Sequence, residues 1–150
     1  MSVSRELESD AQDALARTLL FDLPDAVIYA DRDGNVRFWN AGAERIFGFT
    51  QSEAIGRSLD IIIPERLRKR HWDGYRHMME TGHTSHAPDE LLAVPAVTKT
   101  GESLSIQFTV APVRDAAGTL TGIVSVLRDV TATFRELKRL RTKPNSSSVT

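Results

Sequence analysis

Cysteine is absent from this chain of 150 residues. Its absence excludes disulfides, thiolate metal sites, a cysteine nucleophile and a cysteinyl adduct to a flavin. Long hydrophobic runs are also missing. A membrane-spanning helix requires about 20 consecutive apolar residues, and no stretch of the sequence approaches this length. The first 15 residues are polar and acidic, which is not the pattern of a secretory signal. The sequence therefore predicts a cytoplasmic protein with no membrane association.

An excess of charge of either sign is lacking too. The 19 lysine and arginine residues nearly balance the 20 aspartate and glutamate residues, for a formal net charge of -1. No global field therefore favours nucleic acid or an acidic membrane surface. With 41% hydrophobic and 26% charged residues, the composition is that of an ordinary globular protein. The length is enough for one domain with flanking segments.

The order of strand and helix signals predicts the fold class. The first two strands form a hairpin around Asp33 and Gly34, where glycine readily adopts a positive φ. A cluster of helices follows, the longest over residues 65–80, and three more strands come after it. This order predicts an α+β fold, with a five-stranded antiparallel sheet and short helices on one face. The five predicted strands cover residues 27–30, 36–40, 91–98, 104–113 and 122–130.

Two amphipathic helices flank the predicted domain. We therefore divide the chain into a leading helix (1–22), a domain (23–131) and a signalling helix with a disordered tail (132–150). The leading helix covers residues 5–21, and the tail helix covers 131–141. Their apolar stripes consist of Leu7, Ala11, Leu15 and Leu19 in the first helix and Val130, Phe134 and Leu137 in the second.

The two stripes predict how the protein assembles. An amphipathic helix at the end of a domain must bury its apolar stripe against something. We expect a homodimer made mainly by the leading helix and continued by the tail helix, which would pair in parallel across a two-fold axis. The alternative is a monomer in which the leading helix folds back on its own sheet.

Four segments in a fixed order resemble a PAS domain. They are DAVIYADRDGNVRFWNAGAERIFGFTQSEAIG, the helix after Pro64, the turn KTGE, and GIVSVLRDVT, and together they span about residues 23–131. PAS domains are sensory or protein-interaction modules, and several classes hold a cofactor between the helices and the sheet. The resemblance implies a sensor module in signal transduction, working with an output kinase or regulator in trans or within a longer protein.

The position of His71 carries a narrower resemblance. It lies seven residues after Pro64, with Arg68 and Arg70 beside it. In haem-PAS gas sensors of the FixL type, to which the chain is similar, a histidine at this spacing is the proximal iron ligand. The resemblance therefore implies haem b bound to the protein through His71, and sensing of a diatomic gas or of redox state.

Helical spacing places possible pocket residues around His71. Leu67, His71, Gly74 and Met78 are expected on one stripe that faces the core. Neutral imidazole is a common iron ligand. Gly74, one turn after His71, would leave room for a flat macrocycle. Phe108 on a neighbouring strand is a further candidate for the pocket wall.

The other side of the haem is predicted to be apolar. FixL-type sensors have an arginine nine residues before the glycine of the lysine-threonine-glycine turn, and here that position is Leu92. Leucine cannot donate a hydrogen bond to bound oxygen, so carbon monoxide or nitric oxide would suit this side better. Gln107 on the neighbouring strand is the alternative donor.

Other interpretations remain open. A lone histidine on an apolar face is commonly an ordinary core residue, which leaves a cofactor-free PAS dimerisation or docking module as the main alternative. A small carboxylate or aromatic metabolite in the same pocket is the third. Four aromatic residues either line that pocket or simply form the core: Phe38, Trp39, Phe47 and Phe108.

The other histidines do not form a metal-site pattern, and the sequence contains no recognisable catalytic motif. His77 points about 240° round the helix from His71, so the two cannot share one metal. His83 and His86 flank a short loop without the pattern of a metal site. The chain has no phosphate-binding loop, no kinase histidine box and no hydrolase or nuclease constellation. The sequence therefore predicts that the protein is not an enzyme.

Overall fold

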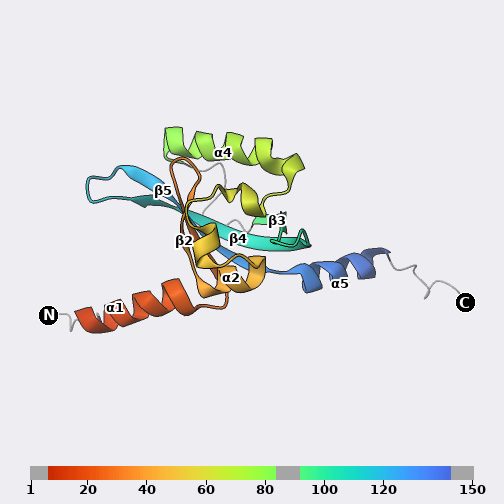
Figure 1. Ribbon diagram of the computed structural model, residues 1–150, viewed down its shortest axis with the longest axis horizontal. Helices are drawn as coiled ribbons and strands as arrows, with labels where there is room; N and C mark the ends of the chain where they lie inside the picture. The colour runs from red at the N-terminus through yellow and green to blue at the C-terminus, as the bar shows by residue number, and fades with distance from the viewer. Residues whose placement is uncertain (1–6, 84–91, 143–150) are drawn as a thin grey trace, which may run out of the picture.

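The computed structural model describes residues 7–83 and 92–142, without the side chain of Leu92. Five strands form one antiparallel sheet in the order β2-β1-β5-β4-β3, which confirms the predicted fold class. Helices lie between the second and third strands of the chain, as expected, and two more flank the sheet (Figure 1). The strands are β1 Ala26–Asp31, β2 Val36–Trp39, β3 Leu92–Val97, β4 Ser103–Arg114 and β5 Leu120–Asp129.

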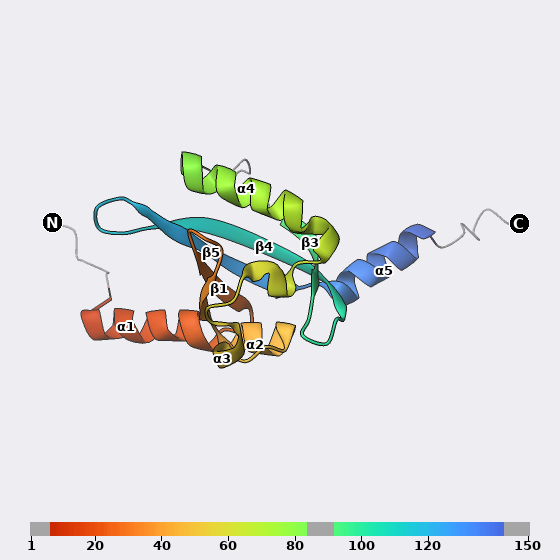
Figure 2. The same ribbon diagram turned by 45° about the horizontal axis from the view of Figure 1, so that its top comes forward.

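The helices divide into a central group and two flanking ones. The central group covers one face of the sheet, and the flanking helices project from the domain (Figures 1 and 2). The central helices are α2 Ala41–Phe47, α3 Gln51–Ala54, the 3₁₀ turns η2 Leu59–Ile62 and η3 Glu65–Leu67, and α4 Arg68–Thr81. The flanking helices are α1 Ser9–Arg17, continued by the π-helical turn η1 Thr18–Asp22, and α5 Thr131–Thr142.

Asn40 joins the first hairpin to the first central helix. Its side chain is buried and caps α2 by accepting a hydrogen bond from the Ala43 backbone N–H at 2.9 Å. The same oxygen accepts from the backbone N–H of Val27 at 2.8 Å, and the side-chain amide donates to the Asp25 carbonyl at 3.0 Å. One side chain therefore fixes the start of α2 against the start of β1.

The next helix, α3, starts with a capping box. The Thr50 hydroxyl accepts from the Glu53 N–H, and the Glu53 carboxylate accepts from the Thr50 N–H. An ion pair with Lys99 lowers the pKa of Glu53 to about 2. Because Lys99 belongs to the turn between β3 and β4, the pair joins the central helices to the far edge of the sheet.

The core lies between the sheet and the central helices, in two clusters of buried side chains. The first cluster contains Trp39 and Phe47, both nearly fully buried, with Phe108 packed against it. The second cluster lies under α4 and contains Tyr75, Met78, Met79, Ala30, Leu120 and Ile123, with Leu59, Trp72 and Val110 packed against it. Trp39 and Phe47 are thus core residues, whereas Phe38 is half-buried and contacts Phe21 with ring centroids 5.1 Å apart.

Several predictions fall outside the described residues. These are the first six residues of the chain, residues 84–91 with His86 and the start of the third predicted strand, and all of the predicted disordered tail except Thr142, which ends α5. Across 7–83 and 92–142, the helices are too short or too polar to cross a membrane.

Candidate ligand site around His71

The buried face of α4 differs from the predicted stripe. His71 and Trp72 are half-buried, and Tyr75, Met78 and Met79 are buried. This spacing puts all five side chains on one face of α4. His71 and Met78 belong to the predicted stripe, and the buried face extends from them towards Trp72 and Met79. The candidate site therefore has aromatic and thioether neighbours rather than a glycine gap.

Gly74 was expected on the stripe that faces the core, but its position is exposed. A Cβ added at Gly74 would meet no atom within 4 Å, so no described part of the chain packs closely against this position. Leu67 is half-buried and belongs to η3, where it is the N-cap residue of α4. A 3₁₀ turn has three residues per turn, so Leu67 does not set the phase of the α-helix that follows.

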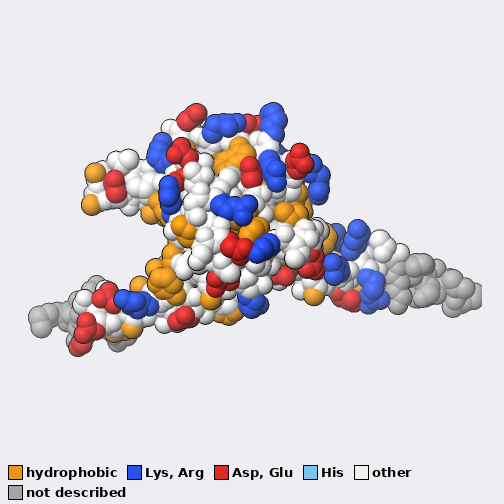
Figure 3. Space-filling view, in the orientation of Figure 1, with side chains coloured by type: hydrophobic (Ala, Val, Ile, Leu, Met, Phe, Trp, Pro, Cys, Tyr) orange, Lys and Arg blue, Asp and Glu red, His pale blue; other side chains and the backbone are white. Residues whose placement is uncertain are grey.

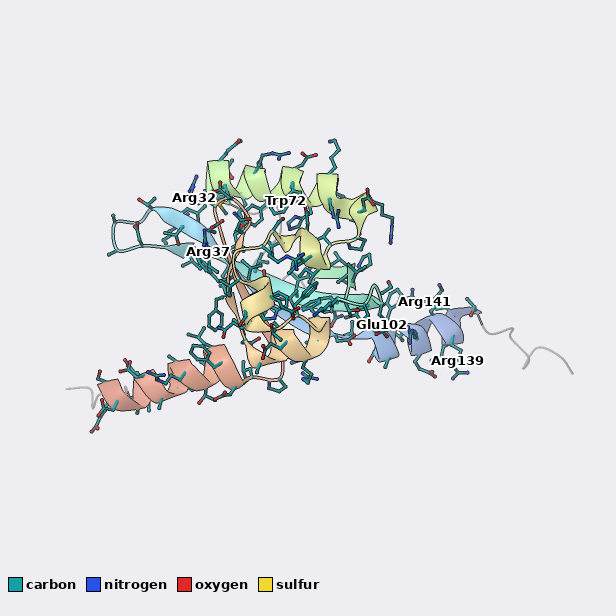
Figure 4. All side chains as sticks on the ribbon, in the orientation of Figure 1. Arg32, Arg37, Trp72, Glu102, Arg139 and Arg141 are labelled. Carbon is teal, nitrogen blue, oxygen red and sulfur yellow. The ribbon has the colours of Figure 1, made fainter. Side chains whose placement is uncertain are left out.

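Trp72 packs α4 against the turn between β1 and β2, which contains Gly34. Its indole N–H donates to the Asp60 carboxylate at 2.7 Å, and its ring lies directly over Gly34 (Figure 4 shows Trp72 reaching from α4). A Cβ on Gly34 would lie 2.1 Å from two atoms of that ring, and Gly34 has a φ of +80°. Glycine is therefore required here for both the backbone conformation and the close approach of Trp72.

Gly34→Ala is expected to lower the free energy of unfolding by about 2–3 kcal/mol, from an unfavourable φ and a steric clash. The displaced Trp72 should also change its fluorescence. Gly74→Ala is the matched control: in an exposed helical position it should stabilise the protein by about 0.5–1 kcal/mol. Chemical denaturation followed by fluorescence measures both. Equal effects of the two substitutions would contradict the Trp72–Gly34 contact.

Two further contacts hold α4 at the same hairpin. The Tyr75 hydroxyl donates to the Asp31 carbonyl at 2.5 Å, and burial raises the pKa of Tyr75 well above its ordinary value. The Arg32 guanidinium donates to the Leu120 carbonyl at 2.7 Å and to the Met79 carbonyl at 3.4 Å. The β1–β2 hairpin thus contacts α4 along the same face that carries His71.

His71 lies among these contacts with an unsatisfied nitrogen. Its ring packs against Trp72 at 4.5 Å and Tyr75 at 5.8 Å between centroids. Among side-chain nitrogens and oxygens in the described part of the chain, His71 Nδ1 alone is buried without a hydrogen-bond partner. Such a group costs about 1–3 kcal/mol. Burial lowers the pKa of His71, although the charge of Asp60 acts in the opposite direction, so the imidazole is neutral at neutral pH.

This shift predicts a pH dependence of stability without any added ligand. Because the pKa of His71 is lower in the folded than in the unfolded protein, stability is full above about pH 6.5 and falls as the pH drops towards the folded pKa. Between pH 7 and pH 5, the unfolding free energy should decrease less in His71→Ala than in the unaltered protein. The exposed His77→Ala variant should keep the full decrease. Urea unfolding at several pH values measures this, and identical slopes in all three proteins would contradict it.

The structure separates the remaining candidates. Phe108 is half-buried against the first cluster, and the backbone of Leu92 pairs with it across β3 and β4. Gln107, as the next residue of β4, lies on the opposite face and lines a groove with Phe134 and Leu137. The suggestion that Gln107 replaces a distal donor was therefore wrong. In the described residues, no three histidine, aspartate or glutamate side chains gather as a metal site, and His77 and His83 are exposed.

The residues present fit a haem group at its axial ligand. His71 offers a half-buried, neutral imidazole whose buried Nδ1 has no partner, and its neighbours in the second cluster are aromatic, aliphatic or thioether side chains. Sequence reasoning found His71 but missed Trp72, Tyr75 and Asp60 as the groups that position it. Trp72 and Tyr75 are three residues apart, so helical spacing could have placed both beside His71. The contact between Trp72 and Gly34 joins residues far apart in the sequence, so no local pattern indicates it.

The fold is an antiparallel sheet with helices over one face, and His71 lies between those helices and the sheet. The PAS fold model matches residues 20–135. The chain belongs to the PAS family, whose domains are typically sensory modules without catalytic activity. It is a PAS sensor module.

Two relatives and one solved structure illustrate the similarity. The chain is 39% identical over 70 residues to sensor protein FixL of Bradyrhizobium diazoefficiens, covering 47% of this chain and 14% of that protein. It is 39% identical over 57 residues to oxygen sensor protein DosP of Escherichia coli, covering 38% and 7%. The structure of an RNA-binding light-oxygen-voltage receptor matches with a TM-score of 0.71 and 19% identity, covering 95% and 41%, and supports the fold alone. The chain thus spans a small part of these relatives.

Proposed function

We propose that this PAS module binds haem b with His71 as the axial ligand and responds to a diatomic gas or to redox state. The single observation that carries the proposal is the buried Nδ1 of His71 without a partner. Similarity to proteins named as a sensor and as an oxygen sensor supports it. A haem group held by His71 would supply an iron to which a diatomic gas could bind.

The residues around His71 suggest how a change at the ligand would spread. His71 contacts Trp72 and Tyr75 directly, and both reach the β1–β2 hairpin through Gly34 and the Asp31 carbonyl. A small movement of the His71 ring would therefore act first on the hairpin. From there β1 pairs with β5, which leads into α5. An output kinase or regulator would receive the signal through α5, in trans or in a longer protein.

The prediction that Leu92 is the apolar residue on the side of the haem opposite His71 remains a prediction, since its side chain lies outside the described part of the chain. Leu67, Met78 and Phe108 are proposed as neighbours of the group, because Met78 is buried beside Tyr75 and Phe108 faces the core. The role of Gly74 in leaving room for the macrocycle stays a prediction.

Titration of the purified protein with haem tests the proposal. A Soret band that saturates at one haem per chain supports it. If the absorbance instead rises without saturating, as it does with a control protein that has no haem site, the result would favour a cofactor-free module.

The second candidate is a cofactor-free PAS interaction module. Its supporting observation is that both flanking helices carry large apolar side chains on their surfaces, including Leu15, Leu19, Phe134 and Leu137. Burial of such side chains against another chain is the ordinary way to stabilise them. This function is compatible with haem binding, but it does not need it.

A further inference from the structure

Asp60 brings a carboxylate to the side of α4 that carries His71. It lies in the 3₁₀ turn η2, where the Ser58 hydroxyl accepts a hydrogen bond from its backbone N–H at 3.1 Å. Its carboxylate oxygen Oδ1 accepts the indole N–H of Trp72 at 2.7 Å. The Trp72 ring packs edge to face against the His71 ring, with 4.5 Å between centroids. A carboxylate is therefore held one side chain away from the proposed iron ligand.

The indole that joins Asp60 to His71 is fixed at both ends. Its N–H is bonded to Asp60, and the opposite edge of its ring lies directly over Gly34. The ring also contacts Tyr75, with 5.3 Å between centroids. A side chain held by a polar contact at one end and by packing at the other has little rotational freedom. The Asp60 carboxylate therefore has a defined position relative to the His71 ring.

The charge of Asp60 acts on the imidazole. Burial lowers the pKa of His71, and the negative charge of Asp60 acts in the opposite direction. Arg68 moderates this charge, because its Nε lies 3.8 Å from the same oxygen Oδ1. The Arg68 guanidinium is shared with two neutral acceptors, the carbonyls of Asp60 and Ile63 at 3.4 and 3.2 Å. Water screens the carboxylate as well, since 38% of the Asp60 side chain is exposed.

The indole itself does not require a charged partner, because a neutral carbonyl oxygen can accept its hydrogen bond. A charge beside a metal ligand has a further effect, since groups around a ligand tune the metal that it binds. A fixed negative charge near a haem iron favours the ferric form, which carries one more positive charge than the ferrous form.

We propose that Asp60, held in place by Trp72, is a positioning residue that lowers the reduction potential of iron bound to His71. This inference rests on the proposed function and narrows it. Oxygen binds to ferrous haem, so a site that favours the ferric form favours redox state over oxygen as the signal. Asp60 acts through Trp72 and through its charge, without contact with the bound group.

Two substitutions of opposite charge test the inference in the full chain. Asp60→Asn keeps an oxygen that can accept from the indole and removes the negative charge, whereas Arg68→Gln removes the positive charge beside it. Spectroelectrochemical titration of the haem-loaded protein measures the midpoint potential. At the midpoint of the unaltered protein, Asp60→Asn should raise the ratio of ferrous to ferric haem about three- to tenfold, and Arg68→Gln should lower it. A loss of packing would not produce shifts of opposite sign.

Asp73→Asn is the matched control on α4. Asp73 is exposed and forms ion pairs with Lys69 and Arg76 at 3.0 and 2.6 Å. Acidic and basic side chains lie side by side over this helix (Figure 3). Neighbouring charges and water therefore screen Asp73, and its substitution should change the ratio by less than about twofold.

Trp72→Phe tests the role of the indole. Phenylalanine keeps an aromatic ring at this position but cannot donate to Asp60, so the carboxylate loses its fixed position. Asp60→Asn should then shift the ratio less in the Trp72→Phe background than in the unaltered chain. In the haem-free chain, NMR should show the Trp72 indole N–H protected from exchange with solvent, and Asp60→Ala should remove this protection.

The outcomes separate this inference from the proposed function. Equal midpoint potentials in the unaltered chain and Asp60→Asn would overturn the inference and leave haem binding intact. Shifts of the same sign in Asp60→Asn and Arg68→Gln, equal effects of Asp60→Asn in both backgrounds, or an unprotected Trp72 indole would also overturn it. A chain that never saturates with haem would instead overturn the proposed function, and this inference with it.

Discussion

Replacing His71 with alanine is expected to abolish stoichiometric haem binding. Among the described residues, His71 alone has a buried side-chain nitrogen without a hydrogen-bond partner. The variant loses this nitrogen from the core-facing side of α4. Without an axial imidazole, the remaining wall of Tyr75, Met78 and Met79 offers only non-specific contact with a macrocycle. Titration with haem, followed at the Soret band, should change from saturation at one haem per chain to a shallow, non-saturating increase.

The fold should survive this substitution, which makes the result interpretable. Removing an unsatisfied buried nitrogen offsets part of the packing loss, so the unfolding free energy should change by no more than about 1 kcal/mol. His77→Ala is the control on the same helix and should retain full binding, because His77 is exposed. Full haem occupancy in His71→Ala would refute the ligand assignment.

Replacing Asn40 with alanine should be among the most destabilising single changes in the domain. The variant leaves the N–H groups of Val27 and Ala43 and the Asp25 carbonyl without their partner, in a place where Asn40 is 1% exposed. Lost capping together with unsatisfied backbone groups should lower the unfolding free energy by about 3–5 kcal/mol. Thermal and urea denaturation measure this loss.

Thr50→Ala provides the matched comparison for Asn40→Ala. Thr50 also caps a helix, but it is exposed, so water can satisfy the groups that its removal leaves free. Its loss should cost about 1 kcal/mol. If the two variants lose the same stability, the account of Asn40 as a joint between β1 and α2 is incorrect.

Local signals predicted most of the sheet and its first turn. The Asp33-Gly34 turn depends on residues close in sequence and has the expected positive φ at glycine. The alternation along β4 puts Ile106 in the core and Gln107 on the outer face, and the expectation that Gln107 would act as a donor to bound oxygen overlooked it. These features follow from backbone conformation and neighbouring side chains alone.

The face of α4 could not be predicted in the same way. Its phase was inferred from Leu67, but that residue lies in a 3₁₀ turn, which rotates the chain differently from an α-helix. The buried face extends towards Trp72 because Gly34, on a distant turn, leaves space for an indole ring. Position 74 therefore faces solvent. Only the tertiary structure brings Gly34 and Trp72 together.

The central claim is that His71 binds the iron of a haem group. Resonance Raman spectroscopy of the haem-loaded ferrous protein tests it most directly, with and without ¹⁵N-labelled histidine. The account predicts an iron–imidazole stretching band that shifts with the label and persists in His77→Ala but not in His71→Ala. An unshifted spectrum, or the same histidine band in His71→Ala, would contradict it.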